Sequence, residues 1–155
     1  MRNFCLFLLP ILTLIGCSDS SIVYQTMNNL DNSYWTQGNP QKYEVEIADP
    51  AASYSLYYLM RYTEDYPFYN IWINKSVTND KKQMISKKLQ GADLFNGKTG
   101  EPNGGGFGNT FDYEILSDSA LHFPQPGKYT IALDQYMRQD TLKGVVAVGI
   151  KLKKN

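Results

Sequence analysis

Few residues of this chain have side chains suited to an active site or a metal centre. The only histidine, His122, lies in a Leu-His-Phe-Pro-Gln-Pro-Gly segment, and the two cysteines are Cys5 and Cys17. A single histidine beside a turn, with carboxylates scattered elsewhere, is more typical of a structural residue than of a metal ligand. No motif of a Ser-His-Asp triad accompanies it. The sequence therefore predicts no metal site and no cofactor.

The carboxylates and glycines do not define an active site either. Glycoside hydrolysis needs two carboxylates about 5 to 10 Å apart in one cleft. The only adjacent acidic pair is Glu64 and Asp65, and nothing selects a pair that would face a cleft. The glycine-rich segment 103–108 lacks the Lys-Ser/Thr ending of a phosphate-binding loop, so we interpret it as a loop or hairpin. We expect a protein that is not an enzyme.

The first sixteen residues have the pattern of an export signal. Arg2 gives the start a positive charge, and the apolar run 4–15 follows it. That run is too short for a membrane-spanning helix, which needs roughly twenty residues. It ends in Leu-Ile-Gly-Cys at residues 14–17, which resembles the lipobox of bacterial lipoproteins. The resemblance implies a cleaved lipoprotein signal peptide at residues 1–16 and lipidation of Cys17, whereas an ordinary signal peptide that contains a cysteine is the alternative.

Lipidation of Cys17 would place the protein in the cell envelope. Each buried methylene of an acyl chain such as palmitate contributes ~0.8 kcal/mol, so two or more chains anchor a protein stably. Cys5 would leave with the signal peptide, and the mature chain would have no free thiol and no disulfide. Ser18 favours the outer membrane over the inner under the sorting rule of enterobacteria. We interpret the polar residues 17–32 as the lipidated N-terminus and a tether, and residues 33–155 as the folded domain.

Composition points to a β-sheet protein of one domain. The chain has 155 residues, with fifteen Lys and Arg against fifteen Asp and Glu. This balance argues against nucleic acid as a partner, since nucleic-acid binding calls for a strongly basic face. Aromatic residues make up 14% of the chain and include twelve tyrosines, a composition that favours strands.

Alternating apolar residues indicate the individual strands. Segments 42–48, 110–116 and 128–134 place one side chain in two on an inner face. Segment 53–63 is apolar on both faces, which is typical of a central strand. Further strands are predicted at 70–77, 83–89 and 145–152, although a short helix is an alternative for 80–89. Seven or eight strands with turns between them predict a single antiparallel β-sandwich, in which a jelly-roll order is one variant.

Four aromatic residues allow two interpretations. Trp35, Tyr66, Tyr69 and Trp72 lie near turns or on strands. Exposed rings would serve as platforms for sugars, which would make the protein a glycan-binding envelope lipoprotein. Rings buried between two sheets would only fill the core, and this second interpretation is favoured.

Two segments resemble the gliding motility lipoproteins of the GldH family. The first is Glu-Asp-Tyr-Pro-Phe-Tyr-Asn-Ile-Trp-Ile at 64–73, and the second is the chain's ending at 123–152. The second segment shares nine residues with the family pattern: Gly127, Tyr129, Gln135, Met137, Arg138, Leu142, Gly144, Val148 and Gly149. Ala147 departs from the family, which tends to have Asp there, and residues 76–109 match only loosely.

The resemblance implies a lipid-anchored envelope protein of the gliding motility machinery, linked to type IX secretion, with no enzymatic activity. Its partners would be the membrane, through Cys17, and envelope proteins of that machinery. We expect the interaction residues in two connections, at Asp65, Tyr66 and Pro67 and at Met137 and Arg138, because binding function concentrates in loops. A salt bridge between Arg138 and Asp140 that only pins the loop is the alternative.

Overall fold

The computed structural model describes residues 19–155. The signal peptide and Cys17 lie outside the described residues, so their predicted roles stay predictions. Within residues 19–155, no helix is long and apolar enough to cross a membrane.

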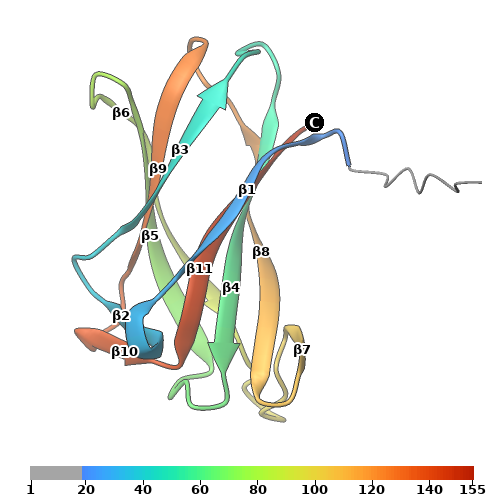
Figure 1. The fold of residues 1–155 in the computed structure, drawn as a ribbon, viewed down its shortest axis with the longest axis vertical. Helices are drawn as coiled ribbons and strands as arrows, with labels where there is room; N and C mark the ends of the chain where they lie inside the picture. Colours follow the sequence, from blue (N-terminus) through green and yellow to red (C-terminus); the bar gives the residue numbers. More distant parts are fainter. Residues whose placement is uncertain (1–18) are drawn as a thin grey trace, which may run out of the picture.

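Eleven strands and one 3-10 turn make up the described part of the chain (Figure 1). The first sheet has the order β1-β11-β4-β8-β7, with β1 Ile22–Asn29, β4 Tyr54–Thr63, β7 Gly105–Phe107, β8 Thr110–Leu121 and β11 Val145–Lys154. The second has the order β3-β9-β5-β6, with β3 Gln41–Ile47, β5 Asn70–Asn79, β6 Met84–Asp93 and β9 Gly127–Gln135. β2 Tyr34–Thr36 pairs with β10 Thr141–Lys143, and η1 spans Asp31–Ser33.

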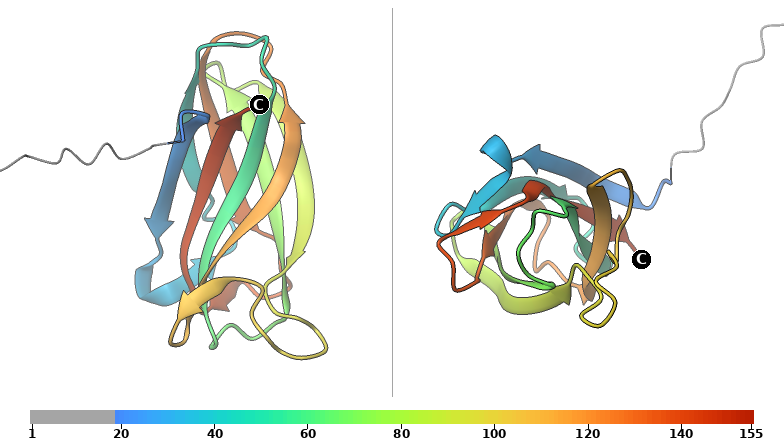
Figure 2. Two further views of the ribbon diagram at one scale, coloured as in Figure 1. Left: turned by 90° about the vertical axis from the view of Figure 1, so that its right-hand side faces the viewer. Right: turned by 90° about the horizontal axis from the view of Figure 1, so that it is seen from below.

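The eight long strands pair in a nested order, first with last. β1 pairs with β11, β3 with β9, β4 with β8, and β5 with β6, always antiparallel. This nesting of one long hairpin, folded over into two sheets, is the jelly-roll arrangement. The prediction of a single antiparallel β-sandwich is confirmed, and its strand order is the jelly-roll variant. Figure 2 shows the two sheets curving around a common core.

The core lies between the sheets and comes from the alternation in the sequence. Alternate residues of β3, β5 and β9 are buried, as in Tyr43, Val45 and Ile47 of β3. β4 is central, and its buried residues include Leu59 on the opposite face from Tyr58 and Met60. Segment 84–93 is a strand and not a helix. Hydrophobic burial along two sheets therefore stabilises the domain without a disulfide.

The prediction of a tether over residues 17–32 is wrong from Ile22 onward. Ile22 to Asn29 form β1, whose register along β11 runs from Ile22 opposite Lys153 to Asn29 opposite Ala147. The folded domain therefore begins at about Ile22 and not at residue 33. The segment's apolar and aromatic residues do not alternate along it (Ile22, Val23, Tyr24 and Met27), and its partner strand lies more than a hundred residues later, so local sequence does not reveal it.

The sandwich has two ends, which we call upper and lower as in Figure 1. The upper end carries the start of β1 and the connections 48–53, 80–83 and 122–126. The lower end carries the connections 64–69, 94–104 and 136–140 together with the β2–β10 pair. Both segments that resemble the GldH pattern contribute a connection to the lower end.

Candidate functional site

An open groove at the lower end brings the two predicted segments together. It has a volume of about 460 Å³. We call it the Trp72 groove, and its lining residues are Phe68, Asn70, Trp72, Leu89, Tyr136, Met137 and Arg138. The lining is mostly apolar, and three of its large side chains (Trp72, Leu89 and Tyr136) are exposed. A monomeric protein rarely leaves such side chains gathered in one place unless they bind something.

Trp72 is exposed because of the strand that carries it. Its neighbours Ile71 and Ile73 face the core, so the alternation of β5 turns the indole outward, where 43% of its surface is exposed. Directly opposite on β6 is Gly91. A Cβ at Gly91 would lie 3.1 Å from the indole Cε2 and Cζ2 atoms. The absence of that side chain lets the ring lie against the strand.

Backbone hydrogen bonds hold the loop after β9 against Trp72. The Tyr136 N–H donates to the Trp72 carbonyl over 2.7 Å. The Trp72 N–H donates in turn to the Met137 Sδ over 3.3 Å. The groove floor is thus made by two segments that lie more than sixty residues apart in sequence. Met137 and Arg138, both predicted as interaction residues, lie in this groove.

The buried amide of Gln135 fixes the shape of the same loop. Its Nε2 donates to the carbonyls of Gln139 and Asp140, over 2.9 and 3.3 Å. Its Oε1 accepts from the Met137 N–H over 2.8 Å. One side chain thereby satisfies three backbone groups of the loop, which orders Met137 and Arg138 at the groove.

The Asp-Tyr-Pro segment lies beside the groove, and its three residues have different surroundings. Tyr66 is buried, its hydroxyl donates to the Asn70 carbonyl over 2.9 Å, and burial raises its pKa. Asp65 is exposed and lies 3.4 Å from the Lys143 Nζ. Pro67 is exposed. Tyr66 therefore supports the connection from within, while Asp65, Pro67 and the neighbouring Phe68 form its outer surface.

Of the four aromatic residues that could be buried or exposed according to the sequence, two are buried and two are exposed. Trp35 and Tyr66 are buried in the core, as the favoured interpretation predicted. Trp72 and Tyr69 are 43% and 54% exposed, and for them that interpretation is wrong. Alternation within β5 could have revealed the outward position of Trp72, but nothing in the sequence marks Leu89 and Tyr136 as its neighbours.

The remaining predictions concern ionic groups. Among residues 19–155 no group of His, Cys, Asp and Glu could hold a metal ion. His122 is exposed in the β8–β9 connection. Arg138 makes no ion pair with Asp140 within the described part of the chain. The alternative of a salt bridge that pins this loop is therefore wrong, and the Gln135 amide has that role.

An ionic pair between the sheets was not anticipated. Lys75 of β5 has no exposed surface, and its Nζ bonds to the Asp118 carboxylate of β8. Burial opposes ionisation of Asp118, but hydrogen bonds from Lys75 and Ser117 outweigh it and hold the pKa of Asp118 below its usual value. The lysine is closed to substrates, so the pair is a structural link between the sheets.

Comparison with known proteins agrees with the two resembling segments. The sequence model of the GldH lipoprotein family matches residues 22–152, which is nearly the whole described sandwich. A curated relative from Christiangramia forsetii, a gliding motility lipoprotein GldH homolog, is 24% identical. The match covers 97% of this chain and 94% of the relative.

Proposed function

Because the chain belongs to the GldH lipoprotein family, we propose that it acts in gliding motility as a membrane-anchored, non-catalytic interaction module linked to type IX secretion. The observation that carries the proposal is the Trp72 groove. Trp, Tyr, Met and Arg, which all line this groove, are residue types enriched at protein interfaces. The groove joins the two segments that resemble the family pattern, and it offers an apolar floor with Arg138 at its edge.

Lipid on Cys17 anchors this module to the cell envelope, at the outer membrane in preference to the inner. Replacing Cys17 by Ser removes the sulfur that receives the lipid. The expected result is loss of the protein from the membrane fraction. Retention of the Cys17→Ser protein in the washed membrane fraction would contradict the anchor.

A cross-linking pull-down of the tagged, lipidated protein from its native host tests the docking role. We expect recovery of envelope proteins of the gliding and secretion machinery. A Trp72→Ser, Tyr136→Ser variant should lose them, because it removes both exposed rings. Tyr34→Ser is the matched control, since Tyr34 is an exposed ring on β2 outside the groove. Equal recovery with all three proteins would contradict docking at the groove.

Glycan binding is a second candidate, favoured by the position of the Trp72 ring. An indole that lies against a strand with its surface partly exposed can stack on a sugar ring. Beside it, the outer face of the second sheet has a hollow of about 810 Å³. Its lining combines apolar surface with polar side chains that include Asn74, Ser76, Thr78, Thr130 and Asp134.

Calorimetric titration with envelope polysaccharides separates the two candidates. Glycan binding predicts saturable heat that Trp72→Ala abolishes while the melting temperature stays near that of the wild type. No heat with any polysaccharide, together with recovery of machinery proteins in the pull-down, would leave the protein-docking role alone.

A further inference from the structure

We infer that the upper end of the sandwich faces the membrane and contacts anionic lipid headgroups, so that the Trp72 groove points away from the bilayer. This inference rests on the proposed lipid anchor at Cys17. It adds which surface of the domain the lipid bilayer meets, and it follows from chain length and charge.

The start of the fold is fixed at the upper end by contacts with the C-terminal strand. The Lys154 N–H donates to the Ser21 carbonyl over 2.8 Å, and the Lys153 Nζ lies 2.9 Å from the Asp19 carboxylate. Cys17 precedes Ser21 by four residues, which span at most about 14 Å when fully extended. A lipidated Cys17 therefore holds this end of the sandwich next to the headgroups.

The lower end lies too far away to share that position. β4 runs from Tyr54 at the upper end to Thr63 at the lower end, and a strand of this length spans about 30 Å. The connections that form the Trp72 groove follow β4 and β9 at their lower ends (Figure 2). With the anchor inserted, the groove reaches lipid only if the whole sandwich lies on its side.

The two ends of the sandwich differ in their unpaired charged side chains, and the difference favours contact of the upper end with an anionic surface. Within residues 19–155, the upper-end lysines without an ion-pair partner are Lys81, Lys82 and Lys128, against the unpaired Glu46 and Asp80. The upper-end carboxylates Asp19 and Asp49 are each paired with a lysine. The unpaired carboxylates of the lower end are Asp31, Glu64, Asp93, Glu101, Asp134 and Asp140, against Lys42, Lys98 and Arg138. The upper end thus has an excess of one unpaired cation and the lower end an excess of three unpaired carboxylates, so an anionic lipid surface favours the upper end over the lower end.

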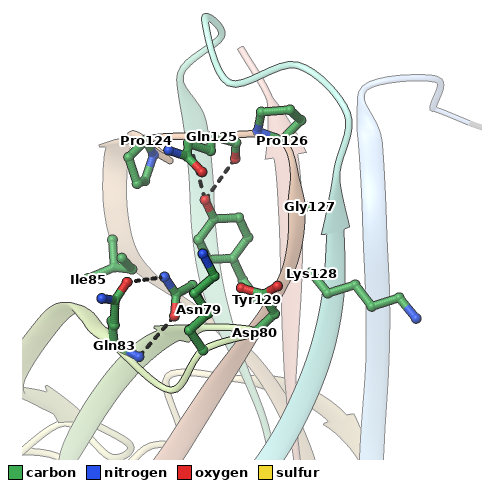
Figure 3. A pocket seen from close by; sticks show the side chains of 11 residues that line it. Asn79, Asp80, Gln83, Ile85, Pro124, Gln125, Pro126, Gly127, Lys128 and Tyr129 are labelled. Carbon is green, nitrogen blue, oxygen red and sulfur yellow. Dashed lines mark hydrogen bonds between the residues drawn. The ribbon is translucent and has the colours of Figure 1, made fainter.

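Hydrogen bonds brace the loops of the upper end, so its lysines are presented on an ordered surface. Figure 3 shows the hollow between the β5–β6 turn and the connection before β9. The Asn79 Nδ2 donates to the Gln83 Oε1 over 2.8 Å, and the Tyr129 hydroxyl donates to the Gln125 carbonyl over 2.7 Å. Lys128 extends outward, away from the hollow. The lysine therefore offers its charge to a surface outside the molecule and not to a ligand inside it.

Three matched cysteine variants of the lipidated protein test the orientation. Gln125 lies at the upper end, Gln25 in the middle of β1, and Gln139 at the lower end, and all three are exposed. Because lipidation occupies the Cys17 sulfur, Gln125→Cys, Gln25→Cys and Gln139→Cys each provide one thiol for a fluorophore. The labelled proteins are reconstituted into vesicles of phosphatidylethanolamine and phosphatidylglycerol that contain lipids with a nitroxide on the headgroup.

We expect severalfold stronger quenching at position 125 than at position 139, with position 25 between them. Strongest quenching at position 139 would overturn the orientation, and strongest quenching at position 25 would show a sandwich lying on its side. The mass of the N-terminal peptide is measured in parallel. A lipidated peptide with the wrong order of quenching overturns this inference alone, whereas an unmodified Cys17 overturns the anchor as well.

Neutralising the lysines tests the headgroup contact separately. The variant Lys81→Gln, Lys82→Gln, Lys128→Gln should reduce quenching at position 125 in the phosphatidylglycerol vesicles but not in vesicles of phosphatidylcholine alone. Lys98→Gln at the lower end is the control and should change neither. Unchanged quenching in the triple variant would overturn the contact with anionic headgroups.

Discussion

Lys75 and Asp118 join the two sheets of the sandwich through an ion pair inside the fold. Lys75 is fully buried on β5, and Asp118 lies on β8 with about a fifth of its side chain exposed. The Ser117 hydroxyl donates to the same carboxylate over 2.8 Å, and the Lys88 Nζ lies 3.6 Å from its other oxygen. The pair therefore stands in a hydrogen-bonded network. Loss of Asp118 would leave the buried Lys75 ammonium without a counter-charge, whereas loss of Lys75 would still leave Asp118 with Ser117 and Lys88.

Asp118→Asn should destabilise the domain by about 3 to 5 kcal/mol, because it leaves the buried ammonium of Lys75 without a counter-charge. Urea unfolding followed by fluorescence measures the change. Asp112→Asn is the control, since its pair with Arg61 is exposed and such pairs contribute about 0 to 1 kcal/mol. Equal losses in the two variants would contradict the role given to the buried pair.

The ion pair between Lys75 and Asp118 should make the free energy of unfolding depend on pH in the acidic range. The pKa of Asp118 is lower in the folded protein than its ordinary value of about 3.9. Its contribution is therefore complete above that value and is lost as the pH falls through the folded-state pKa. We expect the free energy of unfolding to fall more steeply below pH 4 in the wild type than in a Lys75→Met, Asp118→Asn double variant. If the free energy of unfolding fell equally steeply in the wild type and the double variant, the role given to Asp118 would be contradicted.

Gly144→Ala should destabilise the fold more than Gly38→Ala. Both glycines have a positive φ, +79° and +78°, so both substitutions impose similar backbone strain of about 1 to 3 kcal/mol. Only at Gly144 would the new Cβ meet backbone, at 2.5 Å from the Tyr66 nitrogen. Urea unfolding of the two variants isolates this contact. Equal losses of stability in the two variants would mean that the Asp-Tyr-Pro connection moves to accommodate the new methyl group at little cost.

Gly91→Ala should lift the Trp72 indole away from β6. The added methyl would lie 3.1 Å from the ring, so the ring must move by a few tenths of an ångström. We expect more efficient acrylamide quenching of Trp72. Trp35 is buried, so a Trp72→Phe background gives the residual signal to subtract. Unchanged quenching would show that the ring does not rest on Gly91.

Gln135→Leu should loosen the loop at the Trp72 groove. The Gln139 carbonyl and the Met137 N–H lose their partner, whereas the Asp140 carbonyl keeps its bond from the Gln37 N–H. An unsatisfied group costs about 1 to 3 kcal/mol when it is buried and less when water reaches it. Hydrogen exchange at the Met137 amide should accelerate strongly, because that N–H donates to the Gln135 side chain. Exchange at β3 amides serves as the internal reference. If the Met137 amide exchanged as slowly in Gln135→Leu as in the wild type, contacts other than the Gln135 amide would hold this loop in place.

The sequence predicted the strands in which the alternation of apolar and polar residues shows which face is buried. Alternation in β3 and β9 identified the inner residues, and the apolar β4 was recognised as central. The same alternation in β5 places Ile71, Ile73 and Val77 inward. It also places Lys75 inward and Trp72 outward, which composition alone does not suggest. Charged residues are rarely fully buried unless paired, and the partner Asp118 lies 43 residues away.

The site was predicted in part because its residues belong to separate strands. Met137 and Arg138 were anticipated from the family pattern, and the structure places both in the groove. Tyr66 was anticipated as a contact residue, but its ring is buried. Leu89 reaches the groove only through the pairing of β6 with β5, in which Leu89 lies opposite Asn74. The register between β5 and β6 depends on the whole sheet, so it cannot be predicted from the sequence of either strand alone.

The pairing of the first strand with the last has a consequence for how the chain is made and exported. β11 lies between β1 and β4. β4 also pairs with β8, but β1 has no neighbour other than β11 among residues 19–155, so β1 stays unpaired until residues 145–154 are available. A protein whose contacts join distant parts of the chain folds slowly, because long loops must close first. The first sheet thus stays incomplete during most of the chain's synthesis, with β1 unpaired. For a protein carried across a membrane, closure of this sheet would be delayed until β11 has crossed.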